Sequence, residues 1–399
     1  MRILQLCNKP PLPAVDGGCL AIHSVTEGLL QAGIKVRVIA PATHKHPFLP
    51  EQVPASYIEA THFETVPLDT EIHFADALFH LVKNKSYNLS RFYSAALERR
   101  LEEILAAETF DIIQVESLYM TPYLPALRKN SKAKIILRAH NIEHRLWERS
   151  AEVEKNPLKK AYLKKLASQL KKAEAEALCQ VDGLVPITPE DAAAFRAMSK
   201  EKIPVHVLPY AMQLPELIAG KKTDPHSVCH IGSMDWAPNI AGINWFLQHC
   251  WKDILAKIPD ANLHLAGKSL QKDDSRYEAE NVTVHGEVKN AHAFMTDYSV
   301  MAVPLVSGGG MRVKLVEAMA LGKAIVTTTL GAEGTGIVNG THALLADSPA
   351  GFSEAVIRLL ESPGYAASLS KNARHLAETE FEISNATQKL LAFYRSLNA

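Results

Sequence analysis

The sequence contains few cysteines, and none of them forms a familiar metal-binding or disulfide pattern. There are five in 399 residues, at Cys7, Cys19, Cys179, Cys229 and Cys250. Their odd number and wide spacing argue against a disulfide framework or a zinc ribbon and favour a reducing compartment. Long apolar runs are also missing, because no stretch approaches the ~18 residues of a membrane span. The first ten residues become polar too soon for a secretory signal, so we expect a cytoplasmic protein.

The chain also lacks an excess of charge of either sign. It carries 43 basic and 43 acidic side chains, which gives a net charge of zero. Proteins dedicated to nucleic acids normally have a basic surplus, so we expect no nucleic-acid partner. With 47% hydrophobic and 22% charged residues, the composition excludes a disordered chain. The length predicts two domains of about 200 residues each.

Short apolar runs alternate with helical patterns along both halves of the chain. Buried parallel strands need not alternate in polarity, because both faces of their sheet are covered. The strands predicted in the first half are Ile3–Cys7, Ile34–Ile39, Ile112–Val115, Ile135–Leu137, Gly183–Pro186 and Val205–Leu208. Those predicted in the second half are Val228–Ile231, Leu263–Ala266, Val282–Val284, Met301–Val303, Ala324–Thr327 and Leu344–Leu345. Strands separated by helices indicate βαβ crossovers and parallel sheets.

We therefore predict an α/β protein with two Rossmann-like, doubly wound domains that face each other across a cleft. The first domain covers residues 1–209, a linker with several prolines covers 210–225, and the second domain covers 226–379. The last helix, about 380–399, is expected to return to the first domain. In such folds the ligand binds at the carboxyl ends of the strands.

The strongest local feature is a predicted strand that runs into three glycines and then a helix. Gly308–Gly310 let the backbone approach a bulky anion, and the helix start near Met311 offers free N–H groups and the positive end of a dipole. Arg312 and Lys314 fall in the first turn, where cations oppose the dipole, which favours recruitment of an anion such as a diphosphate. Glu317 can accept two hydrogen bonds from a ribose diol. The alternative is a flexible loop followed by a helix with solvated charges.

From Ser307 onward the chain resembles a GT-B glycosyltransferase of the retaining group that carries a Glu-x7-Glu motif. The resemblance rests on Glu317–Val326, Gly331–Gly334 and Leu344–Asp347, and it reaches the first strand and Leu29–Val38. It implies transfer of a sugar from a nucleotide-diphosphate sugar to a hydroxyl of a glycan or a lipid-linked acceptor, with retention and without metal or cofactor. The donor-binding residues indicated by pattern and resemblance are Gly17, Gly18, Gly232, Gly308, Gly309, Gly310, Met311, Arg312, Lys314 and Glu317.

The chain departs from this family pattern at two places. The first motif glutamate falls at Gly309, so Glu317 alone remains for the donor ribose and backbone N–H groups of the glycines remain for the donor sugar. Family members often place an Arg and a Lys after the first strand of the second domain, whereas Ile231–Asn239 contains no cation. We hypothesise that Arg312 and Lys314 supply the missing positive charge to the leaving diphosphate.

The first half contributes candidates for the catalytic and acceptor sites. His140 follows a predicted strand, and members of the resembled group often carry a histidine there, near the donor sugar. His140 is therefore the catalytic candidate, with the role of orienting the donor or the acceptor. The acceptor candidates are Asp16, Glu143 and Arg145, although Asp16 also fits the residue that starts a helix.

Residues 156–172 are different in kind, because they predict a basic helix. Asn156-Pro157 is a helix-start signature, and seven lysines lie between positions 155 and 172 without an acidic residue. The apolar residues that recur every four positions are Leu158, Tyr162, Leu166 and Leu170. Such a helix can lie on an anionic membrane at its inner face, which suits a lipid-linked acceptor. Alternatively, the apolar stripe packs on the protein and the lysines are solvated.

Several other functions and sites compete with this interpretation. A nucleotide-sugar epimerase has the same two-domain architecture, and the change at Gly309 leaves room for a non-catalytic scaffold of this fold. A nicotinamide dehydrogenase needs Gly-x-Gly-x-x-Gly after the first strand, where the chain has Asn8-Lys9-Pro10. The pairs His44-x-His46 and His140-x3-His144 have spacings that suit a metal, but no third ligand is evident, so we expect no metal site.

Overall fold

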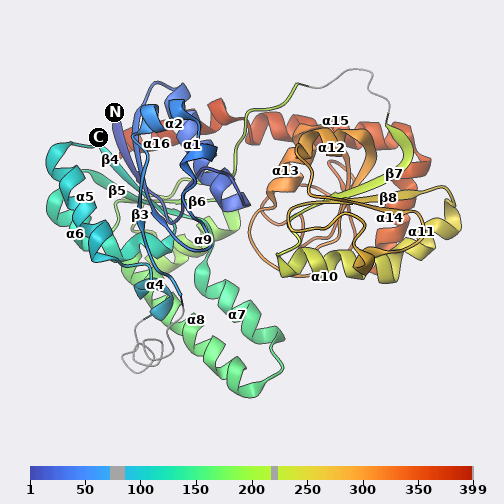
Figure 1. Ribbon diagram of the computed structural model, residues 1–399, viewed down its shortest axis with the longest axis horizontal. Coiled ribbons are helices and arrows are strands. Elements are labelled where there is room, and N and C mark those ends of the chain that lie inside the picture. Colours follow the sequence, from blue (N-terminus) through green and yellow to red (C-terminus); the bar gives the residue numbers. More distant parts are fainter. Residues whose placement is uncertain (72–85, 217–222, 398–399) are drawn as a thin grey trace. The chain divides into compact units, whose positions relative to one another are not determined.

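The computed structural model describes residues 1–71, 86–216 and 223–397 (Figure 1). The chain divides into two compact units, of which unit 1 contains residues 1–211 and 383–399 and unit 2 contains residues 212–382. The sequence placed the corresponding boundaries at 209, 226 and about 380. Residues 217–222 of the predicted linker lie outside the described residues, and the first strand of unit 2 already begins at Asp224.

Unit 1 is built on a parallel sheet with the strand order β3-β2-β1-β4-β5-β6. Its strands are β1 (Arg2–Leu6), β2 (Lys35–Ala42), β3 (Glu64–Pro67), β4 (Ile112–Glu116), β5 (Lys134–Ala139) and β6 (Gly183–Pro186). Its α-helices are α1 (Gly17–Gln31), α2 (Ala55–Thr61), α4 (Tyr87–Ser90), α5 (Ala95–Ala107), α6 (Leu124–Asn130), α7 (Glu143–Val153), α8 (Pro157–Leu178), α9 (Pro189–Ser199) and α16 (Ile383–Ser396). The central strands β1 and β4 are almost entirely buried, as expected for parallel strands that are covered on both faces.

Unit 2 repeats this plan. Its parallel sheet has the order β12-β11-β10-β7-β8-β9. Its strands are β7 (Asp224–Ile231), β8 (Asn262–Ala266), β9 (Val282–Gly286), β10 (Tyr298–Val303), β11 (Ala324–Thr327) and β12 (Leu344–Leu345). Its α-helices are α10 (Ala237–Phe246), α11 (Lys252–Lys257), α12 (Ala291–Asp297), α13 (Val313–Ala320), α14 (Pro349–Glu361) and α15 (Pro363–Glu380). The prediction of two Rossmann-like α/β domains is confirmed.

The strand order of each sheet reverses between its first and fourth strands. This switch lies between β1 and β4 in unit 1 and between β7 and β10 in unit 2. In doubly wound sheets the loops that leave these two strands diverge, which opens a ligand site at their carboxyl ends. The topology therefore directs the search for function to the loops after β1, β4, β7 and β10.

At the edges of unit 1, one strand was missed and one strand prediction was wrong. β3 was missed, because its sequence Glu64–Pro67 is short, half-buried and ends in proline. Residues 205–208 were predicted as a strand, but only Val205 forms an isolated bridge, to Leu184 in β6. Leu208 donates to the carbonyl of Pro186 in β6, yet Pro186 has no N–H to donate in return, so the ladder cannot continue.

The apolar stripe predicted on the basic helix is divided between two faces of α8. Leu166 and Leu170 are buried, whereas Leu158 and Tyr162 are exposed. A spacing of four residues drifts by about 40° per step on a helix with ~3.6 residues per turn, so the two ends of the stripe cannot face the same neighbour. α7 and α8 pack against each other and extend away from the sheet of unit 1 (Figure 1).

Candidate functional site

The switch point of unit 2 is built from glycine turns. Gly308 and Gly310, in the loop after β10, have φ angles of 103° and 82°, a region that favours glycine. A Cβ on Gly308 would lie 3.2 Å from the Trp236 ring, which stands in the loop after β7. The loop after β7 therefore packs directly on the glycine loop, and both lie ahead of the N-terminus of α13.

Lys314 extends from the first turn of α13 to the end of β7. Its Nζ lies 2.9 Å from Asn239 Oδ1 and 3.5 Å from His230 Nε2. A Cβ on Gly232 would collide with the same Nζ atom, so glycine at this position makes room for the ammonium group. His230 Nδ1–H donates to the Ala302 carbonyl at 2.8 Å, which leaves Nε2 as an acceptor toward Lys314.

The electrostatic environment of Lys314 is unfavourable for a charged amine. Burial and the nearby Arg312 lower the pKa of Lys314 to about 7, although Glu317 acts in the opposite direction. Burial and Lys314 also hold the pKa of His230 well below its ordinary value. A positive charge is thus placed at the switch point with no carboxylate among its hydrogen-bond partners named above, so an incoming anion would stabilise it.

Arg312 takes a different position. Its Nη1 donates to the carbonyls of Gly309 and, at 2.7 Å, Gly310. The guanidinium lies 5.4 Å from the centre of the Trp236 ring, and the side chain is buried. Arg312 therefore fastens the glycine loop to the neighbouring loop, whereas Lys314 reaches the strand end. Both lie at the start of α13, as the sequence predicted.

Glu317 lies one turn further along α13 and meets a histidine that the sequence did not indicate. Its Oε1 is 3.3 Å from Nε2 of His292 in α12. This hydrogen bond raises the pKa of His292. The Glu317 side chain is 17% exposed, so its carboxylate can still be reached by a ligand.

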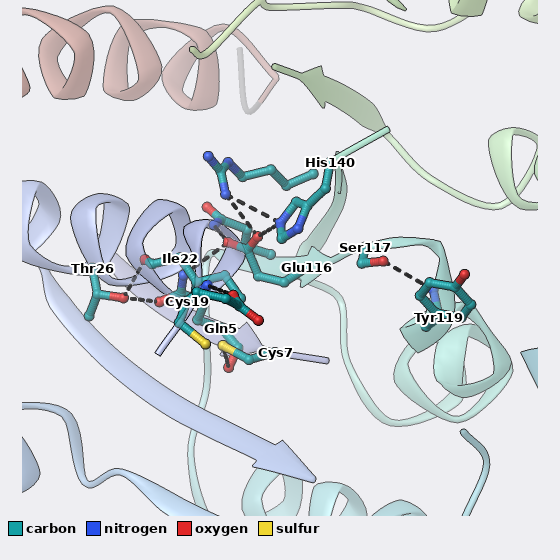
Figure 2. A network of polar contacts seen from close by, with 12 residues as sticks. Gln5, Cys7, Cys19, Ile22, Thr26, Glu116, Ser117, Tyr119 and His140 are labelled. Carbon is teal, nitrogen blue, oxygen red and sulfur yellow. Dashed lines mark hydrogen bonds and ion pairs between the residues drawn. The ribbon is translucent and has the colours of Figure 1, made fainter. Parts of the chain in front are cut away.

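At the switch point of unit 1, His140 is held by a buried carboxylate (Figure 2). Glu116 ends β4, and its Oε2 lies 2.6 Å from His140 Nε2 and 3.1 Å from Arg138 Nη1. Because an ionised carboxylate only accepts, Nε2 carries the proton of a neutral His140 ring. Burial opposes ionisation of Glu116, but Arg138 and His140 outweigh it and lower its pKa to about 2.

Buried amide and hydroxyl side chains form a hydrogen-bonded network with the Glu116 carboxylate. Gln5 Nε2 donates to Glu116 Oε1 at 3.0 Å, and Gln114 donates to the same oxygen. Tyr394 of α16 in turn donates to the Gln114 side chain. Burial lowers the pKa of His140, although Glu116 acts against this shift. His140 is therefore an oriented ring that is neutral at neutral pH and 11% exposed at its side chain.

Asp16 caps α1 by accepting from the Cys19 N–H at 2.9 Å. Its carboxylate also lies 2.7 Å from Lys9 Nζ and 2.9 Å from His46 Nε2. Burial works against the Asp16 charge, but His46 and Lys9 lower its pKa. A Cβ on Gly18 would come within 2.6 Å of Lys9 Nζ. The glycine thus makes room for Lys9 against the helix start.

One group of metal-ligating atoms occurs among the described residues, formed by Asp16, Cys19 and His46. Lys9 already occupies both carboxylate oxygens of Asp16, at 2.7 and 2.8 Å, so a cation there would face an ammonium group. Of the histidine pairs suggested by spacing, His140 and His144 have different partners. His140 contacts Glu116, whereas His144 contacts Glu174 of α8.

Of the acceptor candidates on α7, Glu143 is buried and Arg145 is exposed. Glu143 accepts from the Tyr119 hydroxyl at 2.9 Å, and its own N–H donates to Glu174 Oε1 at 2.7 Å. Burial, with Glu174 nearby, raises the pKa of Glu143 to about 7. Glu143 is therefore a carboxyl group that can gain or lose a proton near neutral pH.

Tyr119 also lines a pocket of about 450 Å³ in unit 1. The pocket lies beyond the ends of β1 and β2, and its walls carry more cations than carboxylates. The lining residues are Asn8, Lys9, Thr43, His44, Lys45, His46, Thr70, Glu71, Arg91, Phe92 and Tyr119. Its volume is in the range of small-molecule sites, roughly 300–1,000 Å³.

Sequence reasoning missed Glu116, Arg138, Asn239 and His292. A charged residue at the end of a buried strand is a signal that Glu116 and Arg138 both carry. Their pairing follows from the register in which Glu116 lies opposite Arg138 on adjacent strands. The contacts of Asn239 and His292 depend on helix packing and had no signal in the sequence.

Comparison with known proteins places these features in context. Residues 225–362 match the family model of the glycosyl transferases group 1. A protein of Klebsiella pneumoniae, described as an uncharacterized 44.6 kDa protein in the cps region, is 24% identical over 371 residues, which cover 89% of this chain and 90% of that protein.

Solved structures extend the similarity to the whole chain. Sucrose-phosphate synthase from Thermosynechococcus elongatus superposes with a TM-score of 0.73 at 17% identity, over 100% of this chain and 99% of that one. HepE from Anabaena, in complex with UDP and glucose, has a TM-score of 0.65 at 15% identity, with coverage of 99% and 100%. TarM from S. aureus, in a complex that includes UDP, has a TM-score of 0.67 at 10% identity, with coverage of 98% and 99%. The chain has the GT-B fold, and the family match supports a glycosyltransferase.

Proposed function

We propose that the protein transfers a sugar from a nucleoside diphosphate sugar to an acceptor hydroxyl, with retention of configuration and without a metal ion. The observation that carries this proposal is the Lys314 ammonium, which lies beside Gly232 and Asn239 at the switch point of unit 2. This site lies within the part of the chain that matches the glycosyl transferases group 1.

In this proposal unit 2 holds the donor. Lys314 contacts the diphosphate, the N–H groups of Gly308–Gly310 contact the donor sugar, and Glu317 accepts from the ribose. Arg312 acts on the donor through the loop that it fastens. Anion binding is favoured further by the N-terminus of α13, where helix N–H groups and the dipole add positive potential.

The chemical step breaks the bond between the anomeric carbon and the diphosphate oxygen, and the electron pair leaves with the diphosphate. The acceptor oxygen bonds to the same carbon on the same face and transfers its proton to the departing diphosphate. Stabilising the charge that develops on the leaving group is the main task of such a site, and Lys314 can do this without a metal. His140, oriented by Glu116, positions the acceptor or the reacting end of the donor.

The pocket of unit 1 is the proposed acceptor site. Two of its lining residues, Lys9 and His46, contact the Asp16 carboxylate. A third, Tyr119, donates a hydrogen bond to Glu143. Arg145 is exposed on the helix that begins at Glu143. The acceptor class, a glycan or a lipid-linked molecule, follows from the family resemblance rather than from the shape of the pocket.

The test measures hydrolysis of UDP-, GDP- and ADP-sugars by the purified chain. NMR then determines the anomeric configuration of the product. We expect the protein to hydrolyse one donor class, and we expect Lys314→Met to lower this rate strongly. Lys289 is an exposed lysine of the same unit, so Lys289→Met should leave the rate unchanged. Failure to bind any nucleoside diphosphate would contradict the proposal. An epimerase would instead release an altered nucleotide sugar without acceptor.

A further inference from the structure

The connection between α7 and α8 exposes unusually large apolar side chains. In the described part of the chain, Leu158 and Val153 are the two most exposed large hydrophobic residues, at 83% and 79%. Tyr162, one turn beyond Leu158, is 41% exposed. All three lie within residues 149–165, which we call the hairpin tip. Single exposed apolar residues are common on protein surfaces, but a cluster at one projection indicates contact with another surface.

The hairpin tip is also strongly basic. It contains two acidic residues, Glu152 and Glu154, and six basic ones. The basic residues are Arg149, Lys155, Lys159, Lys160, Lys164 and Lys165. The resulting net charge of +4 contrasts with zero for the whole chain. The ion pair between Lys159 and Glu154, at 2.6 Å, lowers the positive potential of the tip in part.

The tip is held in a defined conformation. Asn156 caps α8 by accepting from the N–H groups of Leu158 and Lys159 at 3.0 and 3.2 Å. At the base of the hairpin, the carboxylate of Glu174 in α8 contacts both His144 and the N–H of Glu143 in α7. The apolar side chains are therefore presented by two anchored helices, so little ordering entropy is lost on docking.

We infer that the hairpin tip inserts into an anionic phospholipid membrane. Apolar residues at the apex of a projection, surrounded by lysines, match the boundary between acyl chains and negative headgroups. Tyrosine is suited to this depth because its ring is apolar and its hydroxyl is polar. The tip is a projection rather than a groove, so it fits a deformable surface. No helix of the described residues is long and apolar enough to span a bilayer, so the association is by insertion from one side.

This inference differs from a helix that lies flat on its leucine stripe. Leu166 and Leu170 pack inside the protein at 4% and 0% exposure, so only the first two members of the stripe can reach lipid. Together with the proposed function, on which this further step rests, insertion favours an acceptor that is itself anchored in the membrane. The docking itself can be tested independently of any transfer activity.

The experiment is flotation of the full-length chain with vesicles of phosphatidylcholine and phosphatidylglycerol, compared with phosphatidylcholine alone. We expect binding only to the anionic vesicles. The double variant Val153→Ser, Leu158→Ser should lower the affinity for the vesicles by about a hundredfold or more, since fully burying each such side chain contributes about a factor of ten or more to the affinity. Replacing Lys164 with Gln should lower affinity about fivefold, because a lysine near an anionic surface contributes about 1 kcal/mol.

The matched control is Val338→Ser, which changes a side chain in unit 2 that is 55% exposed and should leave flotation unchanged. Circular dichroism and donor hydrolysis verify that each variant is folded. No flotation with anionic vesicles, equal flotation with neutral ones, or flotation unaffected by the tip variants overturns the inference. A chain that floats as expected but hydrolyses no donor upholds membrane docking and contradicts the proposed function.

Discussion

The titration of Lys314 provides the sharpest test of the donor site. In the free protein, burial and Arg312 lower the pKa of Lys314 to about 7, so near neutral pH a large fraction of the molecules lacks the charge. A bound diphosphate favours the ammonium form and raises this pKa. Above pH 7 each binding event must therefore take up a proton. The affinity for a nucleoside diphosphate should fall by about tenfold per pH unit between pH 7.5 and 9.

Calorimetry of UDP binding measures this effect directly. Titrations at pH 8 in two buffers with different ionisation enthalpies give the number of protons taken up, which we expect to be close to one. The phosphates do not titrate in this range, because the second pKa of a phosphate monoester is about 6. Lys314→Met should bind UDP roughly ten- to hundredfold more weakly at pH 7, since a hydrogen bond to a charged group contributes about 1.5–3 kcal/mol.

Lys314→Arg is the matched control, because arginine does not lose its proton in proteins. Its affinity for UDP should be nearly independent of pH between 7.5 and 9. A flat profile in the natural protein, or an equally steep profile in Lys314→Arg, refutes the assignment of the charge to Lys314. In the ligand-free protein the linkage predicts that the free energy of unfolding rises relative to Lys314→Met as pH increases above 7, since only the folded state releases this proton there.

Three further predictions concern other parts of the two units. Glu116→Gln should lower kcat about 100-fold by releasing the His140 ring, with little change in the KM for the donor, and it should shift the pH profile of kcat. Gly267→Ala should lower the free energy of unfolding by about 2–3 kcal/mol in urea, because Gly267 has a φ of 148° and its new Cβ would collide with the Gly232 carbonyl. The contribution of His264 to the free energy of unfolding, measured as the difference between the natural protein and His264→Phe, should fall by roughly 1 kcal/mol per pH unit from pH 6.5 toward 4, because burial, with His285 nearby, lowers the pKa of His264 to about 4.

Each of these predictions has a specific control. Tyr394→Phe removes a distant partner of the Glu116 network and should affect stability more than kcat. Gly340→Ala, at a φ of 73° with open space around it, should cost only about 1 kcal/mol. His264→Phe keeps an aromatic ring but removes the titrating group. The free energy of unfolding of this variant should therefore fall less steeply below pH 6.5. Equal effects of target and control would count against the respective argument.

The sequence was informative where one element carries the signal by itself. The mainly apolar runs of β4 and β10 and the glycines before α13 are local patterns, and their places in the fold were predicted. The contact between Glu116 and His140 was not, because it depends on which strands become neighbours. The division of the α8 stripe was missed for a similar reason, since packing on α7 and on the core of unit 1 determines which leucines are buried.

The two departures from the family pattern in unit 2 have different physical backgrounds. Gly308 and Gly310 have positive φ angles, but Gly309, where the family places its first glutamate, is not among the residues with positive φ. The backbone therefore does not require glycine at 309, and the missing carboxylate is not imposed by the turn. Gly232 is different, because a side chain there would displace both Lys314 Nζ and Asn239. The absence of a cation after β7 and the presence of Lys314 on α13 are therefore linked, because glycine at 232 leaves the space that the Lys314 ammonium occupies.

A double-mutant cycle tests this last point. Gly232→Ala should displace the Lys314 ammonium and weaken UDP binding at pH 7 nearly as much as Lys314→Met, by roughly ten- to hundredfold. If both changes act through the same contact, the double variant should bind no more weakly than Lys314→Met alone. Additive losses would mean that Gly232 approaches the ligand through its own backbone. The diphosphate would then be held by two separate groups, and Lys314 would not be the replacement for the missing strand-end charge.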